Sequence, residues 1–482
     1  MRPGCGPGVM QRTEASDRII CMLAAMPPTP DATAPGAAGP DREVPDRGRA
    51  DACPGALRLH TADDGALARI RLPGGLLTDR QALALAEAAE ALGDGELETT
   101  SRGNVQLRGL APHCAAELAD RLRAVGLLPS DTHERVRNIV ASPAAGLDAA
   151  GGPGRADVQA WVRELDARLC ASDWAAGLSG KFLFALDDGR GDVAALDADV
   201  TLIAGPDGTR LLRLGRADRG HPVEAGQEVT AVLEAARSFL AVLRTNGRKA
   251  WHLREVPDLL PAGLVPLPAF AGAAPAVGAL PGGLSVGLRF GRAGAGQWRA
   301  LVAASAGELR LTPWRGAVLP GAPADRLPAL AAAGFRTEPG SAWERATACT
   351  GLPGCAKSLA DVRSDAARAL DSGAAAAGGA ALDAGAALDA GAAAGAGLAV
   401  GAGAGPAGVL PVHWSGCERR CGHPAGRWVD VLATGRGYRV TVNAAGAGAT
   451  AADAVDVKDA TGVDVTNEEM AEAVAEARRT TK

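Results

Sequence analysis

Residues 95–108 read GELETTSRGNVQLR, and residues 307–319 read GELRLTPWRGAVL. A Pro-Gly-Gly turn and a helical pattern precede each stretch, at residues 73–92 in the first copy and 281–304 in the second. In the first copy Thr78 is a suitable N-cap for its helix. Because a turn, a helix and two strand-like segments recur in the same order, the sequence predicts an internally duplicated α+β molecule with approximate twofold symmetry.

Two further segments organise the chain. Residues 137–255 contain strand patterns such as Val200–Ala204, and Val229–Arg244 has the spacing of an amphipathic helix. The Pro-rich residues 256–280 are expected to link the two halves. Residues 372–408 are almost wholly Ala and Gly, which supply little core, so they are predicted to be a flexible insertion.

Composition narrows the class of protein. The 482 residues carry a net charge of −5, which argues against a general nucleic-acid binder. No apolar run reaches the roughly 18 residues that span a bilayer. Residues 1–52 lack a good signal-peptide core and are expected to be a disordered leader, so the expected compartment is the cytoplasm. Cysteines there are more often thiols or metal ligands than disulfides.

Four of the nine cysteines form two close pairs. Cys349 and Cys355 lie in ACTGLPGCAKS, and Cys417 and Cys421 lie in HWSGCERRCGHP. Four thiolates in two clips suit a metal centre with four sulfur ligands, and the surrounding Gly and Pro favour turns that aim backbone N–H groups at sulfur. A gap of five residues is awkward for structural zinc, so a [4Fe–4S] cluster is predicted. Structural zinc and unliganded thiols remain alternatives.

These features together resemble the nitrite and sulfite reductase superfamily, over roughly residues 53–450. The cysteine pairs, the duplicated Gly-Glu-Leu units and Thr99–Arg108 carry the resemblance. It implies an α+β, internally duplicated architecture with ferredoxin-like half-domains and Fe–S or tetrapyrrole-binding domains. The expected division is a leader at 1–52, a first ferredoxin-like half-domain at 53–136, a first tetrapyrrole/Fe–S-type domain at 137–255, a linker at 256–280, a second half-domain at 281–340, a second Fe–S cluster domain at 341–450 with the insertion at 372–408, and a C-terminal tail with a short helix at 451–482.

Within the superfamily, the chain looks most like the precorrin-3B synthases. The phrases DACPG at 51–55, LTPWRG at 311–316 and HWSGCERRCG at 413–422 are similar to that family. The resemblance implies a cobalamin-pathway monooxygenase that hydroxylates precorrin-3A with O₂ and closes a ring-A acetate into a lactone. It also implies a [4Fe–4S] cluster, a non-haem iron, NADH as the ultimate reductant and an electron-donor protein. Neither nucleic acid nor membrane is expected as a partner.

The resemblance also implies a cationic pocket. Precorrin-3A, like sirohaem, is edged with carboxylates, which Arg binds well. Arg102, Arg137 and Lys181 match pocket cations of the reductases, and Arg419 and Arg420 are further substrate-binding candidates. The alternative is that these are surface or strand-edge charges.

The ligands of the implied iron are not visible as a motif. The candidates His413, His423 and Glu418 flank the last cysteine pair, and imidazole with carboxylate is a usual iron ligand set. Histidines beside a cluster also hydrogen-bond to sulfide or backbone, so that alternative stays open.

Two other functions remain. A sirohaem-dependent nitrite or sulfite reductase is the first alternative, and sirohaem is expected only in that case. The reductases carry a second lysine two residues after the first, whereas this chain has Leu183, which favours the monooxygenase. The second alternative is a non-catalytic Fe–S redox protein.

Overall fold

The computed structural model describes residues 51–147, 157–205, 207–256, 264–377, 410–443 and 462–479, apart from residues 52, 248, 269, 271 and 425. The expected leader therefore lies outside the described residues except for Asp51. Most of the expected insertion at 372–408 also lies outside them, although helix α8 (Val362–Ala377) continues into its first residues.

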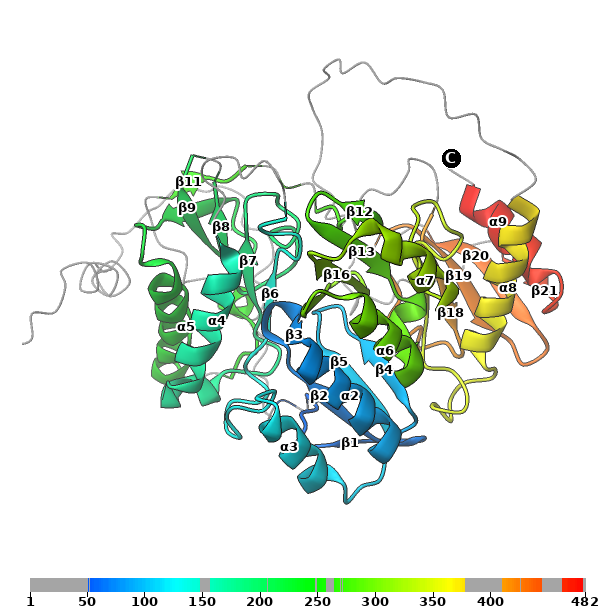
Figure 1. Cartoon of the computed structure of the whole chain (residues 1–482), viewed down its shortest axis with the longest axis horizontal. Helices are drawn as coiled ribbons and strands as arrows, with labels where there is room; N and C mark the ends of the chain where they lie inside the picture. The colour runs from blue at the N-terminus through cyan, green and yellow to red at the C-terminus, as the bar shows by residue number, and fades with distance from the viewer. Residues whose placement is uncertain are drawn as a thin grey trace, which may run out of the picture.

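Two five-stranded sheets form the middle of the molecule, one for each copy of the repeated unit (Figure 1). Their orders are β1-β2-β5-β4-β14 and β12-β13-β16-β15-β3. Each sheet is completed by a strand from the other half, so the two copies form one unit. The strands are β1 (His60–Ala62), β2 (Gly65–Ile70), β3 (Leu76–Thr78), β4 (Glu96–Thr99), β5 (Val105–Leu110), β12 (Gly278–Leu280), β13 (Gly283–Gly287), β14 (Arg292–Gly294), β15 (Glu308–Leu311) and β16 (Gly316–Pro320).

The helices of this unit share one hydrophobic core. They are α2 (Asp79–Leu92), α3 (Ala115–Ala124), α6 (Ala295–Ala304) and α7 (Leu327–Ala332). The predicted cap is confirmed, because Thr78 Oγ1 accepts a hydrogen bond from Gln81 N and the Gln81 side chain accepts one from Thr78 N. Helices α2 and α6 pack together, and the buried Trp298 Nε1 donates to Ala82 O at 2.9 Å. The duplication therefore holds the two halves together through equivalent helices.

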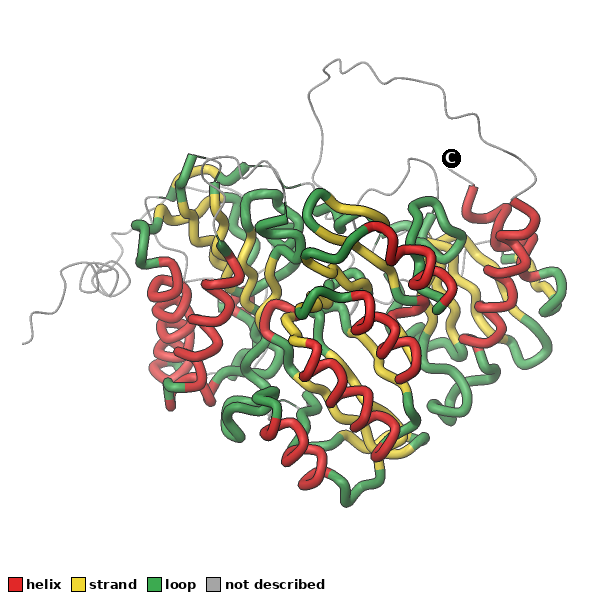
Figure 2. Tube along the Cα trace, viewed as in Figure 1, coloured by secondary structure: helices red, strands yellow, loops and turns green. Residues whose placement is uncertain are grey.

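Two outer domains flank the middle unit and are also related to each other. One has the sheet order β11-β10-β9-β8-β7-β6 and the other β17-β18-β19-β20-β21, and the first three strands in chain order are parallel in both. Figure 2 shows their helices at opposite ends of the molecule. The elements are β6 (Ile139–Ala141), α4 (Val158–Cys170), β7 (Phe184–Asp187), β8 (Val200–Ala204), β9 (Arg210–Leu214), β10 (Arg219–Pro222), α5 (Glu228–Thr245) and β11 (Val265–Pro266), then β17 (Ala346–Ala348), α8, β18 (Val412–Ser415), β19 (Trp428–Ala433), β20 (Tyr438–Asn443), β21 (Val463–Val465) and α9 (Met470–Arg479).

The end of the chain is part of the second outer domain. Strand β21 pairs with β20, and Met470 and Val474 of α9 are buried in that domain's core. Residues 463–479 are thus part of the second outer domain, whereas the sequence analysis placed them in a C-terminal tail with a short helix. The short 3-10 helices are η1 (Pro73–Gly75), η2 (Asp173–Gly177), η3 (Leu253–Glu255), η5 (Arg289–Gly291) and η6 (Ala324–Arg326).

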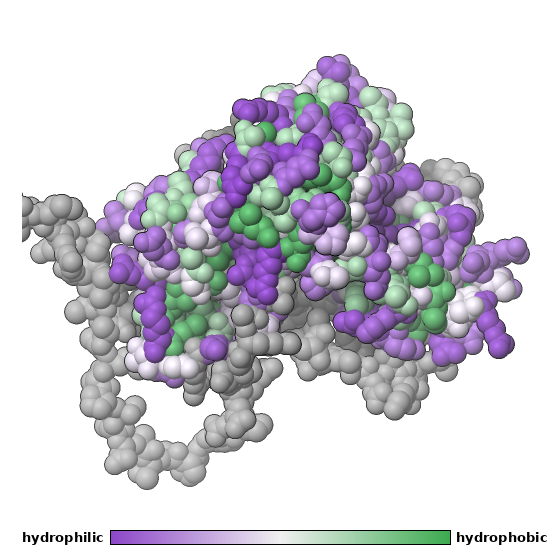
Figure 3. Space-filling view, turned by 90° about the horizontal axis from the view of Figure 1, so that it is seen from below, coloured by the Kyte–Doolittle hydropathy of each residue, from purple (hydrophilic) through white to green (hydrophobic). Residues whose placement is uncertain are grey.

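The surface is mixed in character. Among the described helices, none has both the length and the hydropathy needed to cross a membrane. Figure 3 shows hydrophobic residues on one face in separate groups between hydrophilic ones.

Candidate cluster site and cationic face

The two cysteine clips meet at one edge of the last sheet. Cys349 directly follows β17, and Cys417 lies two residues beyond β18. Because these strands are parallel neighbours, their carboxyl ends lie at the same edge. The backbone N–H of Gly416 donates to Cys349 Sγ at 3.2 Å, which joins the two clips. The structure therefore places Cys349 beside the loop of Cys417, although the two cysteines are more than 60 residues apart in sequence.

The four cysteines suit an iron–sulfur cluster. None of the described cysteines is in a disulfide, and those of the two clips are partly or fully exposed. Burial raises the pKa of the Cys349 thiol, whereas hydrogen bonds from the N–H groups of Gly416 and Gly351 favour its thiolate. Four-iron clusters hold their cysteine sulfurs further apart than the ligands of one ion. Thiols on two facing loops with N–H donors aimed at sulfur fit such a group.

The first half-domain holds the Cys355 loop from outside. Arg108 of β5 forms a partly buried ion pair with Asp64 at 2.8 Å and also donates to Gly354 O at 3.3 Å. The adjacent Asp63 accepts a hydrogen bond from Ala356 N at 2.7 Å. The residues on both sides of Cys355 are therefore fixed by the turn between β1 and β2 and by β5.

The Cys349 loop is held through a buried carboxylate. Arg363 of α8 donates to Cys349 O at 3.1 Å and to Glu98 at 2.6 Å. Glu98 also pairs with Arg292 at 3.1 Å and accepts from Gln106 at 3.1 Å. Burial raises the pKa of Glu98, but Arg363 and Arg292 bring it below its ordinary value. Glu98 is thus an anion that links both halves to the cluster loop.

A group of cations continues from this network across the sheet, and we call it the cationic face. Arg69 donates to Gln106 at 2.9 Å, and Arg102 donates to Lys181 O at 3.1 Å. Lys181 Nζ lies 3.9 Å from the centre of the Trp251 ring. Burial lowers the pKa values of Arg69 and Arg102, which marks desolvated cations. The cationic face consists of Arg69, Arg102 and Lys181, and the buried Arg71 lies behind it and donates to Arg135 O at 3.2 Å and Gly180 O at 3.1 Å.

The five predicted substrate-binding cations separate into different places. Arg102 and Lys181 lie together in the cationic face. Arg137 is buried, pairs with Asp166 at 2.6 Å, donates to Leu127 O at 3.0 Å, and lines a separate cavity with Asp166 and Arg71. Arg420 is likewise held by Asp430 and Glu418, both at 2.6 Å. Arg419 faces a different cavity, beside Cys417.

The predicted iron ligands do not converge. His413 is fully buried, with Nδ1 2.8 Å from Thr347 Oγ1, and burial lowers its pKa to about 3. His423 stacks on Trp428, and its Nδ1 lies 2.9 Å from Pro424 O. Glu418 is exposed and paired with Arg420. Among the described residues, His413, His423 and Glu418 do not bring ligand atoms within 4.8 Å of one another, so they do not form a site for one iron ion in this structure.

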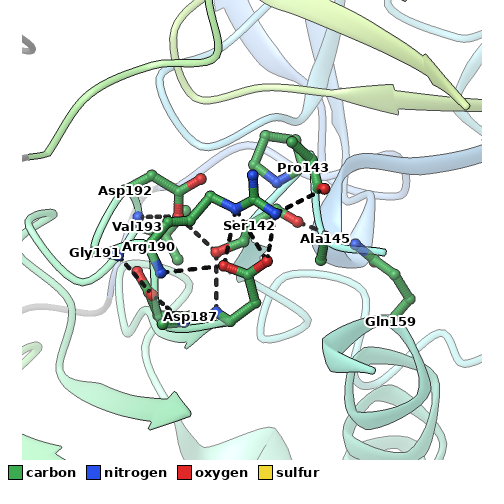
Figure 4. Close-up of polar contacts among 12 residues, drawn as sticks. Ser142, Pro143, Ala145, Gln159, Asp187, Arg190, Gly191, Asp192 and Val193 are labelled. Atoms are coloured by element: carbon green, nitrogen blue, oxygen red, sulfur yellow. Dashed lines mark hydrogen bonds and ion pairs between the residues drawn. The ribbon is translucent and has the colours of Figure 1, made fainter. Parts of the chain in front are cut away.

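A different trio of metal-ligand side chains does come together (Figure 4). In the part of the chain that the structure describes, only Asp187, Asp188 and Asp192 place ligand atoms of three residues within 4.8 Å. Their loop follows β7, in the position that the Cys417 loop occupies after β18. Asp187 accepts N–H bonds from Gly189, Gly191 and Ala194, Asp188 pairs with Arg190, and Asp192 accepts from Ser142. These partners satisfy most of the carboxylate oxygens, so the loop is held by its own hydrogen bonds.

Sequence reasoning missed several members of the site. Arg69 lies in β2 and Arg71 directly follows that strand, and Gln106 and Arg108 alternate along β5. Alternation by two places side chains on one face of a strand, and this was the available signal. Arg363 and Glu98 are 265 positions apart, and no local pattern indicates their contact.

The fold places the chain in a class of structures similar to nitrite and sulfite reductases. Residues 60–125 match the nitrite/sulfite reductase ferredoxin-like half domain. Over 127 residues the chain is 39% identical to a ferredoxin–nitrite reductase of Synechococcus elongatus, covering 26% of this chain and only a quarter of that relative. The NirA protein of Mycobacterium tuberculosis has the same fold, with a TM-score of 0.57 at 18% identity, covering 84% of this chain and 79% of NirA.

A more specific similarity covers most of the chain. A precorrin-3B synthase of Sinorhizobium sp is 26% identical over 426 residues, which covers 83% of this chain and 84% of that enzyme. The resemblance to precorrin-3B synthase within the nitrite and sulfite reductase superfamily is therefore confirmed. The similarity to the reductases is consistent with an Fe–S cofactor.

Proposed function

We propose that the chain is a monooxygenase of the precorrin-3B synthase type. It hydroxylates precorrin-3A with O₂ and forms the ring-A acetate lactone, with one oxygen atom entering the substrate and the other leaving as water. Two electrons, ultimately from NADH through a donor protein, balance the reaction. The single observation that carries this proposal is the similarity to a precorrin-3B synthase over more than four-fifths of both chains.

The cationic face supports the proposal that the substrate carries several carboxylates. Arg102 and Lys181 lie side by side, and Trp251 restricts Lys181. Buried guanidiniums bind carboxylates strongly because water competes less there, and a rigid face also fixes the orientation of the ring. Glu98 keeps Arg363 and Arg292 in place beside this face.

The cysteines at the ends of β17 and β18 would hold the [4Fe–4S] cluster. When bound, such a cluster supplies electrons one at a time. The protein's contribution is to position both loops, through Arg108 at Gly354 and Arg363 at Cys349. These contacts bring the sheet that bears the cationic face against the cluster loops, which favours electron transfer to a bound ring.

Leu183 argues against reduction of a small anion. The side chain is buried in an apolar cluster, and the described residues place no second lysine there. Without that cation, sulfite or nitrite would lose stabilisation of its developing charge.

A visible spectrum of anaerobically purified protein tests the proposal. A broad brown shoulder without Soret or red bands is expected, and sirohaem bands would instead favour a nitrite or sulfite reductase. Incubation with precorrin-3A, reductant and O₂ should then give a product heavier by one oxygen atom. A cluster-containing protein that does not bind precorrin-3A would point to a non-catalytic Fe–S protein.

A further inference from the structure

Each copy of the repeated unit contains a hairpin with a five-residue connection. The connections are residues 100–104, between the paired ends of β4 and β5, and residues 312–316, between those of β15 and β16. In both, the first residue donates a backbone N–H bond to the carbonyl of the fifth at 2.9 Å. The fourth residue has a left-handed φ in both, 66° at Gly103 and 60° at Arg315. The two connections therefore correspond residue by residue.

At the third position the two copies differ in chemistry. The first copy has Arg102, whose guanidinium donates to Lys181 O at 3.1 Å. The second copy has Trp314, which packs against a buried apolar cluster that includes Leu183. The duplication therefore brings a cation and an indole, from equivalent positions, to the segment that leads into β7.

This segment has two sides. Phe182 and Phe184 lie in the core beneath α4 and α5, whereas Leu183 belongs to a smaller cluster on the other side of the sheet. Lys181 and Leu183 are two residues apart, so an extended chain places them on the same side. Trp314 is only partly buried there. The side that carries Lys181 of the cationic face therefore also carries an apolar wall, formed by Leu183 and Trp314.

We propose that Trp314 is a specificity-determining residue, whose indole packs against the macrocycle of the substrate while the cationic face binds its carboxylates. This inference rests on the proposed function and names the residue that selects a ring over other anions. A flat ring that covers the indole displaces water from apolar surface on both partners. A small oxyanion has no such surface, so it would lose hydration at this wall without gaining a contact. The hydrogen bond across residues 312–316 holds the indole in place before binding, which lowers the entropic cost.

The test separates contact with the ring from binding of charge. Anaerobic equilibrium dialysis gives the Kd for precorrin-3A at low and at high salt, and the quenching of tryptophan fluorescence at saturation reports an indole that lies against the ring. The variants are W314L, W314F and R102A. The control is W174L, because Trp174 is also partly buried but packs on the helix side of the same domain.

We expect W314L to raise the Kd about tenfold or more, with no change in the ratio between the Kd values at high and low salt. R102A should raise the Kd and also reduce that ratio, because it removes a charge. W314F keeps an aromatic ring, so its Kd should stay within about threefold of wild type, while the quenching amplitude falls. W174L should bind as the wild type does.

An unchanged Kd in W314L would overturn the contact between the indole and the ring. Equal quenching amplitudes in W314F and wild type would do the same, and this readout decides the question if W314L does not fold. A reduced salt ratio in W314L would show that Trp314 acts through the cationic face, which also contradicts the proposal. In each of these cases the proposed function stands, whereas a wild-type chain that does not bind precorrin-3A would refute that function and this contact together.

Discussion

Arg108 and Asp64 form a partly buried ion pair at 2.8 Å, and the same guanidinium donates to Gly354 O beside Cys355. The pair thus joins the sheet that carries the cationic face to a cysteine loop of another domain. Its first consequence is geometric, because Cys355 cannot move without breaking contacts of the first half-domain.

Replacing Arg108 with Ala should therefore loosen the cluster loop. It leaves Asp64 without its partner, and we expect a loss of about 1–3 kcal/mol in the free energy of unfolding. Iron and sulfide per chain should fall after desalting in air, whereas R108K should retain more of both. Wild-type iron content and stability in R108A would show that the contact does not position Cys355.

Asp192 should make the stability of the protein depend on pH, and this effect does not involve the cluster. Burial, and then the neighbouring Asp187, raise its pKa to about 7 from an ordinary value of 3.8. A carboxyl whose pKa is raised by folding stabilises the folded protein fully at pH values below the pKa of the unfolded chain. This contribution to the free energy of unfolding is lost as the pH rises through about 7. Asp192→Asn keeps an oxygen that accepts from Ser142 and Val193, and it removes the charge.

We therefore expect D192N to unfold at a higher temperature than wild type at pH 8, with a smaller difference at pH 5. Thermal unfolding across this range measures it, and D325N, at an exposed site, is the control. A difference that is the same at both pH values would contradict the raised pKa.

Arg420 has a backbone conformation that glycine would adopt more easily. Its φ is 45°, and its guanidinium is the ion-pair partner of the buried Asp430 at 2.6 Å. Arg420→Gly relieves the backbone strain of the positive φ but leaves Asp430 as a buried charge without its partner. We therefore expect the free energy of unfolding to fall by about 2–4 kcal/mol. R420G/D430N should recover at least half of this loss in denaturant unfolding. If the double variant is less stable than R420G, the buried charge is not the cause.

Arg102 is the cation whose loss should weaken substrate binding most directly. Removing one charged hydrogen bond costs about 1.5–3 kcal/mol, so R102A should raise the Kd for precorrin-3A about 10- to 100-fold. Anaerobic fluorescence titration measures the Kd, and R121A is the control. Unchanged affinity would exclude Arg102 from the binding face.

Much of the fold could be predicted because its signals are local. The repeated turn and helix, with the cap at Thr78, depend on residues a few positions apart. The exchange of β3 and β14 between the halves could not be predicted, because each has three residues and pairs with a strand about 200 positions away. The pairing depends on the assembled core, which no window of sequence contains.

The site divides in the same way. The cluster site was predicted from the spacing of the cysteines and the turns around them, because four thiolates in two close pairs suit few kinds of metal centre. The arginines were harder to assign because 45 of the 50 basic residues are Arg, so no single Arg stands out. Arg137 is an example: the resemblance to the reductases suggested a pocket cation, but no local pattern predicted its ion pair with Asp166, 29 residues later.

The proposed monooxygenase activity is tested most directly by following the oxygen atoms of O₂ through one turnover. The cluster-containing chain is incubated anaerobically with precorrin-3A and reductant, and isotopically heavy O₂ is then admitted. A cluster-dependent monooxygenase should give a product that gains one heavy oxygen atom, and the variant C417S should give no such product. A product without heavy oxygen, or equal gain in C417S, would contradict a cluster-dependent monooxygenase.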